Sequence, residues 1–262
     1  MWNIMKALNY QTRRDNVVIY ALLAGLLFPF LTVILETGFD LDGLSGGLFM
    51  AELGSNYPVV FSIVFVILGP RICGWDATDK TMNYEIMAGH SRKEVYFGRV
   101  IVSLIWSMVS GIVIMVLPVL VMTMINGWGE NVNVYDAVIR YLLILFPMFR
   151  LICELILLTF LLRNCYVSML VGWVLFDAAL IGSMVYMELT EKQLTVQLAA
   201  SNLITLFGFD NYKLEYVGGE DIPVFSAGLS SSMILGTVFV SLLVGGICLA
   251  IGYVVFQKRD MS

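Results

Sequence analysis

The sequence has few charged residues. Asp, Glu, Lys and Arg make up only 13% of its 262 residues, whereas apolar residues make up 59%. Soluble domains carry about 25% charged residues, so this composition excludes an ordinary soluble domain. The long uncharged runs predict a membrane protein instead.

Histidine and cysteine are also scarce. The single histidine is His90, and the four cysteines lie in or beside apolar runs with no CxxC spacing. No HExxH motif, no Ser-His-Asp set and no GxxxxGK[ST] phosphate loop occurs. We therefore expect no catalytic residue, no metal site and no bound cofactor in this chain, and we interpret the cysteines as reduced packing residues.

Six apolar runs are long enough to be membrane spans, each of which needs about 20 apolar residues. The second run is the shortest. The runs predict an all-α integral membrane protein in which residues 1–262 form one transmembrane domain. They are Val17–Leu35, Pro58–Cys73, Val100–Ile125, Ala137–Leu162, Val167–Met187 and Ser232–Phe256.

Basic residues concentrate on one side of these runs. If the N-terminus is inside, the outer segments hold only Lys192 and Lys213, and the other loop cations lie inside. By the positive-inside rule, both termini are cytoplasmic, residues 75–99 form an inner loop and residues 188–231 form an extracellular segment. The stretch LSGGL at residues 44–48, which is similar to the signature loop of ATP-binding-cassette ATPases, then lies outside. We expect Gly43, Gly46 and Gly47 to form a flexible loop there.

Residues 1–16 precede the first span and include apolar Trp2, Met5 and Leu8 near helical spacing, together with three basic residues. This pattern predicts an amphipathic helix on the inner membrane surface, with a frayed terminus as the alternative. We expect no cleavable signal peptide, because residues 1–15 have no apolar core and the first apolar run is long enough to stay in the bilayer.

The inner loop holds a second distinctive pattern. Residues 79–90, DKTMNYEIMAGH, contain helix formers, and Gly89 fits a helix C-terminus. Ser91 followed by Glu94 predicts a capping box that starts the next helix. We expect a helix, a sharp turn at Gly89 and His90, and a second helix. This elbow suits docking in a groove of a cytoplasmic partner; the alternative is a loop that only anchors the third span at the headgroups.

The stretch EIMAGHSRKEVYFGRVI in this loop resembles the first cytoplasmic loop of ABC type-2 permeases, the transmembrane subunits of ABC exporters. The layout of the whole chain is similar as well. The resemblance implies a permease that pairs with a second copy or a homologue and binds separate ATP-binding-cassette ATPase subunits, which hold the ATP and Mg. It assigns ATPase coupling to five residues: Glu85, Gly89, His90, Ser91 and Arg92.

Three charged residues lie within predicted spans. Arg150 and Glu154 are one helical turn apart, and Asp177 lies in the next span. Each such charge costs about 2.5–3.5 kcal/mol at the bilayer centre, so we expect Arg150 to face the protein interior and to bond Glu154, Asp177 or both. This polar cluster either fixes the packing of two spans or lines a pathway. In the second case the chain is an ion-coupled secondary transporter or a channel, although no inverted repeat is present.

Before the last span, residues 194–207 have apolar positions on one helical face, and residues 210–225 are rich in turn formers. We expect a helix that rests at the outer interface or dips into it, followed by a turn-rich cap. We expect a bacterial, multi-pass plasma-membrane protein surrounded by lipid. Its Met-rich and aromatic-rich spans suit a hydrophobic or amphipathic peptide or small molecule, and we expect no nucleic-acid partner.

Overall fold

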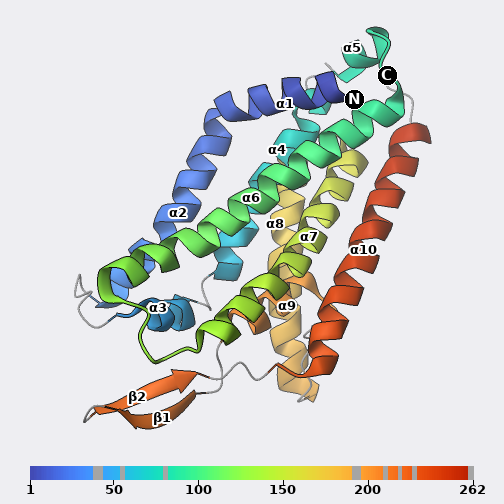
Figure 1. The fold of residues 1–262 in the computed structure, drawn as a ribbon. Coiled ribbons are helices and arrows are strands. Elements are labelled where there is room, and N and C mark those ends of the chain that lie inside the picture. The colour runs from blue at the N-terminus through green and yellow to red at the C-terminus, as the bar shows by residue number, and fades with distance from the viewer. Residues whose placement is uncertain are drawn as a thin grey trace.

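The computed structural model describes residues 1–37, 44–53, 57–78, 82–190, 196–208, 212–217, 220–225 and 229–258. These residues form a bundle of long helices with small elements at its two ends (Figure 1). The elements are α1 (Trp2–Arg14), α2 (Asn16–Thr37), α3 (Gly46–Leu53), α4 (Tyr57–Thr78), α5 (Met82–Met87), α6 (Arg92–Asn126), α7 (Val134–Leu162), α8 (Cys165–Thr190), α9 (Ala199–Phe207), β1 (Tyr212–Val217), β2 (Glu220–Phe225) and α10 (Ser231–Lys258).

Each predicted span lies within one helix: α2, α4, α6, α7, α8 or α10. In the part of the chain that the structure describes, five helices are long and apolar enough to cross a membrane alone. A sixth passes when α1 is joined to the first part of α2, from which it is bent by 62°. The protein is thus a multi-pass helical membrane protein.

The two ends of the bundle differ. In Figure 1, α1 and α5 lie at the same end as the start of α6 and the end of α10, whereas α3 and the two strands lie at the opposite end. The arrangement agrees with both chain ends lying on one side of the membrane. That this side is the cytoplasm stays a prediction.

A β-hairpin departs from the all-α prediction. Strands β1 and β2 pair antiparallel, with Tyr212 opposite Phe225, and the Phe225 N–H donates to Asn131 O at 2.7 Å. The sequence analysis predicts only a turn-rich cap for residues 210–225. The missed sequence signal is the Gly218-Gly219 pair between two segments that contain Tyr, Val and Ile, which favour strands.

The prediction of a flexible loop at LSGGL is wrong for Gly46 and Gly47, while Gly43 lies outside the described residues. These two glycines begin α3, and their N–H groups donate to Gly127 O and Trp128 O at 2.9 and 2.8 Å. A Cβ on Gly46 would lie 2.0 Å from Thr123 Oγ1, so only glycine fits against α6. The glycines therefore serve close packing rather than flexibility.

The centre of the bundle is packed by aromatic rings and close helix contacts. The rings of Tyr57 and Phe61 in α4 lie 5.0 and 5.3 Å from that of Phe207 in α9. A Cβ on Gly111 of α6 would lie only 2.1 Å from Met148 of α7, which shows how closely these two helices approach. Such contacts hold helices together in lipid, where the hydrophobic effect between them is weak.

Candidate functional site

The predicted elbow is formed by α5 and the residues that follow it. The Gly89 N–H donates to Ile86 O at 3.0 Å, and the His90 N–H donates to Glu85 O at 3.2 Å. These two bonds are the Schellman pattern of a helix C-terminus. Gly89 has φ of +92°, a conformation that side chains disfavour. The sharp turn is therefore built on glycine, as the sequence predicts.

The capping box that follows the turn is present. The Glu94 N–H donates to Ser91 Oγ at 3.3 Å, and the Ser91 N–H donates to Glu94 Oε2 at 3.1 Å. The Met1 amino group of α1 lies 3.1 Å from Glu94 Oε1. Glu94 precedes the apolar part of α6. The Ser91 N–H and the Met1 ammonium group lower the pKa of the Glu94 carboxyl group to about 2. The start of α6 is thus capped by Ser91 and joined to the N-terminus of α1.

A buried ion pair joins α5 to the next turn of α6. The Glu85 Oε1 atom lies 2.8 Å from Arg99 Nη2; the Arg99 side chain is fully buried and that of Glu85 is 26% exposed. In the sequence, Arg99 is one of the basic residues of the predicted inner loop, residues 75–99, and nothing there marks it as an ion-pair partner. Its partner lies 14 positions earlier across a turn, so helical spacing could not reveal the pair.

Arg92 makes a third connection. Its Nη1 donates to the backbone carbonyl of Gln257, in the last turn of α10, at 2.8 Å. A cation at a helix C-terminus is favourable because the carbonyl groups there carry partial negative charge. The first two turns of α6 therefore contact α1, α5 and α10 through Glu94, Arg99 and Arg92.

The five residues that the family resemblance selects have different surroundings. Glu85, Ser91 and Arg92 make the contacts just described, and Gly89 makes the turn. His90 contributes its backbone N–H, and its side chain has no hydrogen bond within the described ranges. Met87, which is not among these five residues, is 79% exposed beside the turn and is a large apolar side chain that the described part of the elbow presents outward.

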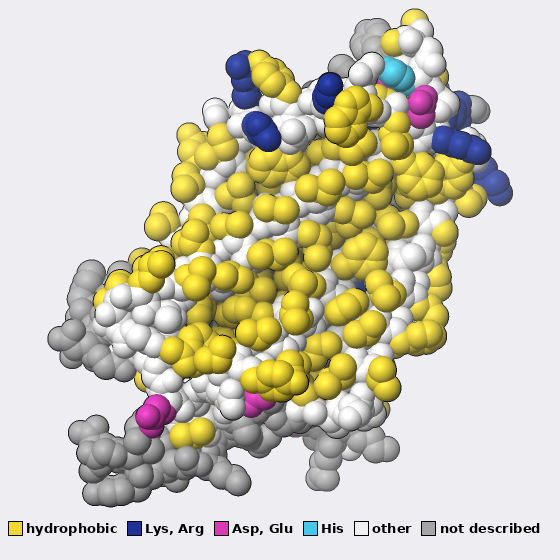
Figure 2. Space-filling view, viewed as in Figure 1, with side chains coloured by type: hydrophobic (Ala, Val, Ile, Leu, Met, Phe, Trp, Pro, Cys, Tyr) yellow, Lys and Arg dark blue, Asp and Glu magenta, His cyan; other side chains and the backbone are white. Residues whose placement is uncertain are grey.

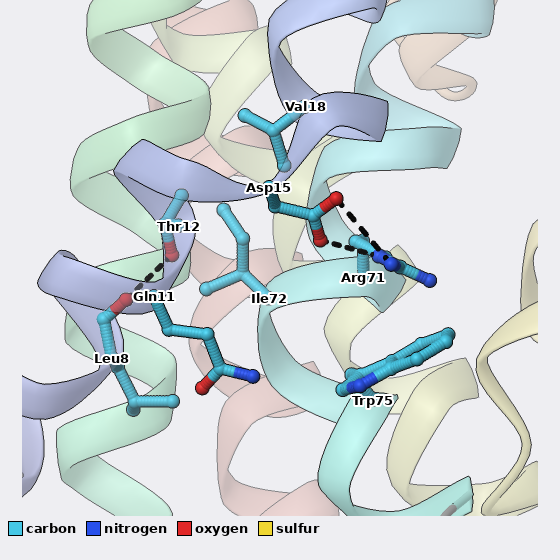
Figure 3. Close-up of a pocket in the computed structure, with 8 residues that line it drawn as sticks. All are labelled: Leu8, Gln11, Thr12, Asp15, Val18, Arg71, Ile72 and Trp75. Carbon is cyan, nitrogen blue, oxygen red and sulfur yellow. Dashed lines mark hydrogen bonds and ion pairs between the residues drawn. The ribbon is translucent and has the colours of Figure 1, made fainter.

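A second cluster at the same end of the bundle fixes the bend between α1 and α2. Figure 3 shows the Asp15 carboxylate facing the Arg71 guanidinium of α4, with Oδ2 to Nε at 2.6 Å and Oδ1 to Nη2 at 3.3 Å. Asp15 Oδ1 also accepts from the Val17 N–H at 2.9 Å and so caps α2. The guanidinium carbon of Arg71 lies 3.4 Å from the centre of the Trp75 ring.

This α1–α4 cluster was not predicted. Asp15 stands just before the first apolar run, which is a helix N-cap signal. Its ion-pair partner is 56 positions away, beyond the reach of any sequence pattern. The cluster connects the end of α1 to the C-terminal part of α4, which precedes the elbow in the chain.

The polar cluster in the spans is only partly assembled. Arg150 Nε lies 2.8 Å from Glu154 Oε1, and its other nitrogens donate to Val196 O and Gln197 O at 3.3 and 2.8 Å. Asp177 is half-buried and has no ion pair among the described residues. Arg150 thus holds the chain just before α9, and the geometry supports a packing role.

A second arginine of α7 holds the other end of α9. Arg140 is buried, and its Nη1 donates to Leu206 O at 3.1 Å and to Gly208 O at 2.5 Å. Helix α9 therefore lies alongside α7 between these two arginines, with its residues Ala199–Leu203 buried. Part of the segment predicted as extracellular, 188–231, is packed inside the bundle, in keeping with the alternative of a helix that dips inward.

A hollow of about 310 Å³ lies beside the Arg150–Glu154 pair, between α7, α8 and α9. Its walls are mainly apolar and include Leu155, Gly172 and Phe176. A space of this kind suits the apolar part of a small molecule. In the regions covered by the structure, no cluster of three or more His, Cys, Asp or Glu residues could hold a metal ion.

Comparison with known proteins identifies a family. A family model described as ABC-2 family transporter protein matches residues 10–179, well over half of the chain. The matched range includes α5, the turn at Gly89 and the whole of α6 and α7. No curated protein and no solved structure matches the chain.

Proposed function

Since the chain belongs to the ABC-2 family of transporter proteins, we propose that it is the permease subunit of an ATP-driven exporter and that its ATPase partner docks on the elbow at α5. The family is a membrane transport component and not itself the ATPase. ATP and Mg would be bound by the partner, whose cycle would drive movement of this chain's helices.

The observation that carries this proposal is the set of contacts at the start of α6. Glu85–Arg99 joins α5 to α6, Glu94 joins α6 to α1, and Arg92 joins α6 to α10. A rigid displacement of α5 would therefore reach α6 directly, and α1 and α10 through α6. An anchor loop would need cations at the headgroups but would not need a buried ion pair.

We assign separate roles to the residues of the elbow. Met87 and His90 contact the partner, because one is exposed and apolar and the other has no hydrogen bond of its own in the described structure. Gly89 allows the sharp turn whose shape fits a groove of the partner. Glu85 and Arg92 transmit displacement from α5 to α6 and from α6 to α10.

The transported molecule is proposed to be hydrophobic or amphipathic, a peptide or a drug-like compound, and to leave the cell through a pathway between two permease subunits in the plasma membrane. Supporting this, α8 and α10 carry many exposed large apolar side chains, among them Trp173, Leu175 and Phe239. Such faces contact either lipid or a second subunit. The hollow beside Arg150 offers an apolar space of suitable character within each subunit.

The rival function, an ion-coupled carrier that uses Arg150, Glu154 and Asp177, is less well supported. The Arg150 guanidinium pairs with Glu154 and donates to two backbone carbonyls. These bonds hold the segment before α9 in place. Asp177 takes no part in that network. A proton relay would need these groups to exchange protons with one another or with a pathway.

The test is co-purification with an ABC ATPase. The full chain would be tagged in its native membrane, and the retained ATPase identified by its phosphate loop and its hydrolysis of MgATP. We expect the Gly89→Ala, Arg92→Gln variant to retain at most about a tenth of the ATPase, since strain at positive φ costs about 1–2 kcal/mol. The Lys93→Gln variant changes an exposed residue next to Arg92 and should retain all of the ATPase. Full retention by the double variant would contradict the proposal.

A further inference from the structure

The corner between α1 and α6 contains a second hollow, of about 330 Å³, unrelated to the elbow contacts. Trp2, Lys6, Asn9 and Arg13 line it from α1, and Ile105 and Trp106 line it from α6. Because α1 is bent by 62° from α2, it lies across the end of the bundle (Figure 1). The hollow lies between α1 and α6. One wall is thus cationic and the other is apolar.

Among the described residues, no acidic side chain pairs with the cations of this hollow. Lys6 and Arg13 are exposed and two helical turns apart, about 10 Å along α1. Neither has an ion pair with a described acidic residue. Two described acids that contact the ends of α1 are already paired: Asp15 pairs with Arg71, and Glu94 pairs with the Met1 amino group.

The remaining polar groups of the hollow are held in place. The Trp106 Nε1–H donates to Asn9 Oδ1 at 3.0 Å, which fixes both side chains where the cationic and apolar walls meet. The Lys6 ammonium lies 5.4 Å from the ring centre of Trp2, which is 64% exposed. Tryptophan rings of this kind are typical of the headgroup level of a bilayer.

An apolar track continues from the hollow along α6. Its exposed large side chains recur on one side of the helix at three- and four-residue intervals: Ile105, Val109, Ile112, Val113, Leu117, Leu120 and Met124. Figure 2 shows dark blue side chains along the α1 end of this face and an almost continuous yellow surface beyond them. An acyl chain would lie against this track with its headgroup at the hollow.

We propose that the α1–α6 corner is a binding site for one acidic phospholipid of the leaflet that borders α1. Its phosphate would contact Lys6 and Arg13, and its chains would follow the track on α6. A zwitterionic lipid would leave one or both cations uncompensated. Because α1 is attached to α4 through Asp15 and to α6 through Glu94, a bound lipid would also stabilise the position of α1 against the elbow.

The experiment measures lipid binding to the purified full-length protein by native mass spectrometry. Phosphatidylglycerol and phosphatidylcholine with identical chains would be titrated in turn. Each cation near an anionic headgroup contributes roughly fivefold to binding. We therefore expect the Lys6→Gln, Arg13→Gln variant to bind phosphatidylglycerol about thirtyfold more weakly than the natural sequence, close to its affinity for phosphatidylcholine.

A matched control removes the same charge elsewhere. Arg14 lies beside Tyr10, 4.3 Å from its ring centre and outside the hollow, and Lys93 is exposed at the start of α6. The Arg14→Gln, Lys93→Gln variant should bind phosphatidylglycerol within twofold of the natural sequence. The proposal is overturned if the two lipids bind equally to the natural protein, if the control variant loses as much affinity, or if millimolar inorganic phosphate displaces the lipid, which would indicate a site for free anions.

Discussion

Replacing Glu85 by Gln should loosen the attachment of α5 to α6. The side chain keeps its size and can still accept a hydrogen bond from Arg99, but the negative charge 2.8 Å from a fully buried guanidinium is lost. Removing one partner of a buried ion pair costs about 3–5 kcal/mol. Because the Glu85 side chain is 26% exposed and the amide retains a hydrogen bond, we expect a smaller cost, about 2 kcal/mol.

Hydrogen exchange can measure this free-energy cost at the backbone amides of the elbow itself. A local destabilisation of about 2 kcal/mol makes the amides of residues 85–90 exchange about thirtyfold faster, while those of α8 are unchanged. A double-mutant cycle with Arg99→Gln isolates the pair. We expect the two single effects not to add in the double variant. Glu130→Gln, an exposed acid in the α6–α7 loop, is the control.

Two outcomes would refute this reasoning about the elbow. In the first, Glu85→Gln changes the exchange of residues 85–90 by less than twofold. In the second, the two single effects add to within about 0.5 kcal/mol, as expected for residues that do not interact. Either result would mean that α5 is positioned by something other than the Glu85–Arg99 pair.

Three further predictions concern other parts of the structure. Asp15→Asn should lower the melting temperature by about 2–4 °C for each kcal/mol lost and speed hydrogen exchange in α1, because Arg71 loses its charged partner; unchanged exchange in α1 would contradict the α1–α4 cluster. Gly46→Val should abolish the contact of α3 with α6 and lower the yield of folded protein, since even a Cβ does not fit there; a normal melting temperature would contradict this. Asp177→Asn should leave ATP-driven export intact in a transport assay, and loss of export with normal folding would revive the ion-coupled carrier.

The parts of the fold that could be predicted are those that depend on residues close together in the sequence. Apolar runs of about 20 residues located all six long helices to within a few residues, apart from the early start of α6 at Arg92 and the late end of α4. The Ser91–Glu94 box and the turn at Gly89 were predictable because each depends on residues at most five positions apart.

The contacts that define the candidate site could not be predicted in this way. Asp15 and Arg71 are 56 positions apart in the sequence, and Arg150 and Gln197 are 47 apart. No periodic sequence pattern indicates either contact. The loop prediction for Gly46 was wrong because glycine serves both flexibility and close approach, and only the packing against α6 distinguishes them. Arg150 was predicted to face inward, but its use of backbone carbonyls could not be foreseen.

The central claim is that the elbow faces the cytoplasm and is covered by an ATPase. The described cysteines Cys73, Cys153, Cys165 and Cys248 are all buried, so a single exposed cysteine can be introduced at Met87, which is 79% exposed. Met124→Cys, at a position 84% exposed near the far end of α6, is the control. The measurement is the rate of labelling by a membrane-impermeant maleimide in inside-out vesicles, with and without the ATPase. We predict that Met87→Cys is labelled in stripped vesicles and that rebound ATPase slows this labelling at least tenfold. Met124→Cys, at the opposite end of α6, should stay unlabelled in these vesicles with or without the ATPase, which checks their orientation. Labelling of Met87→Cys only from the external face, or a rate that the ATPase leaves unchanged, would contradict the account.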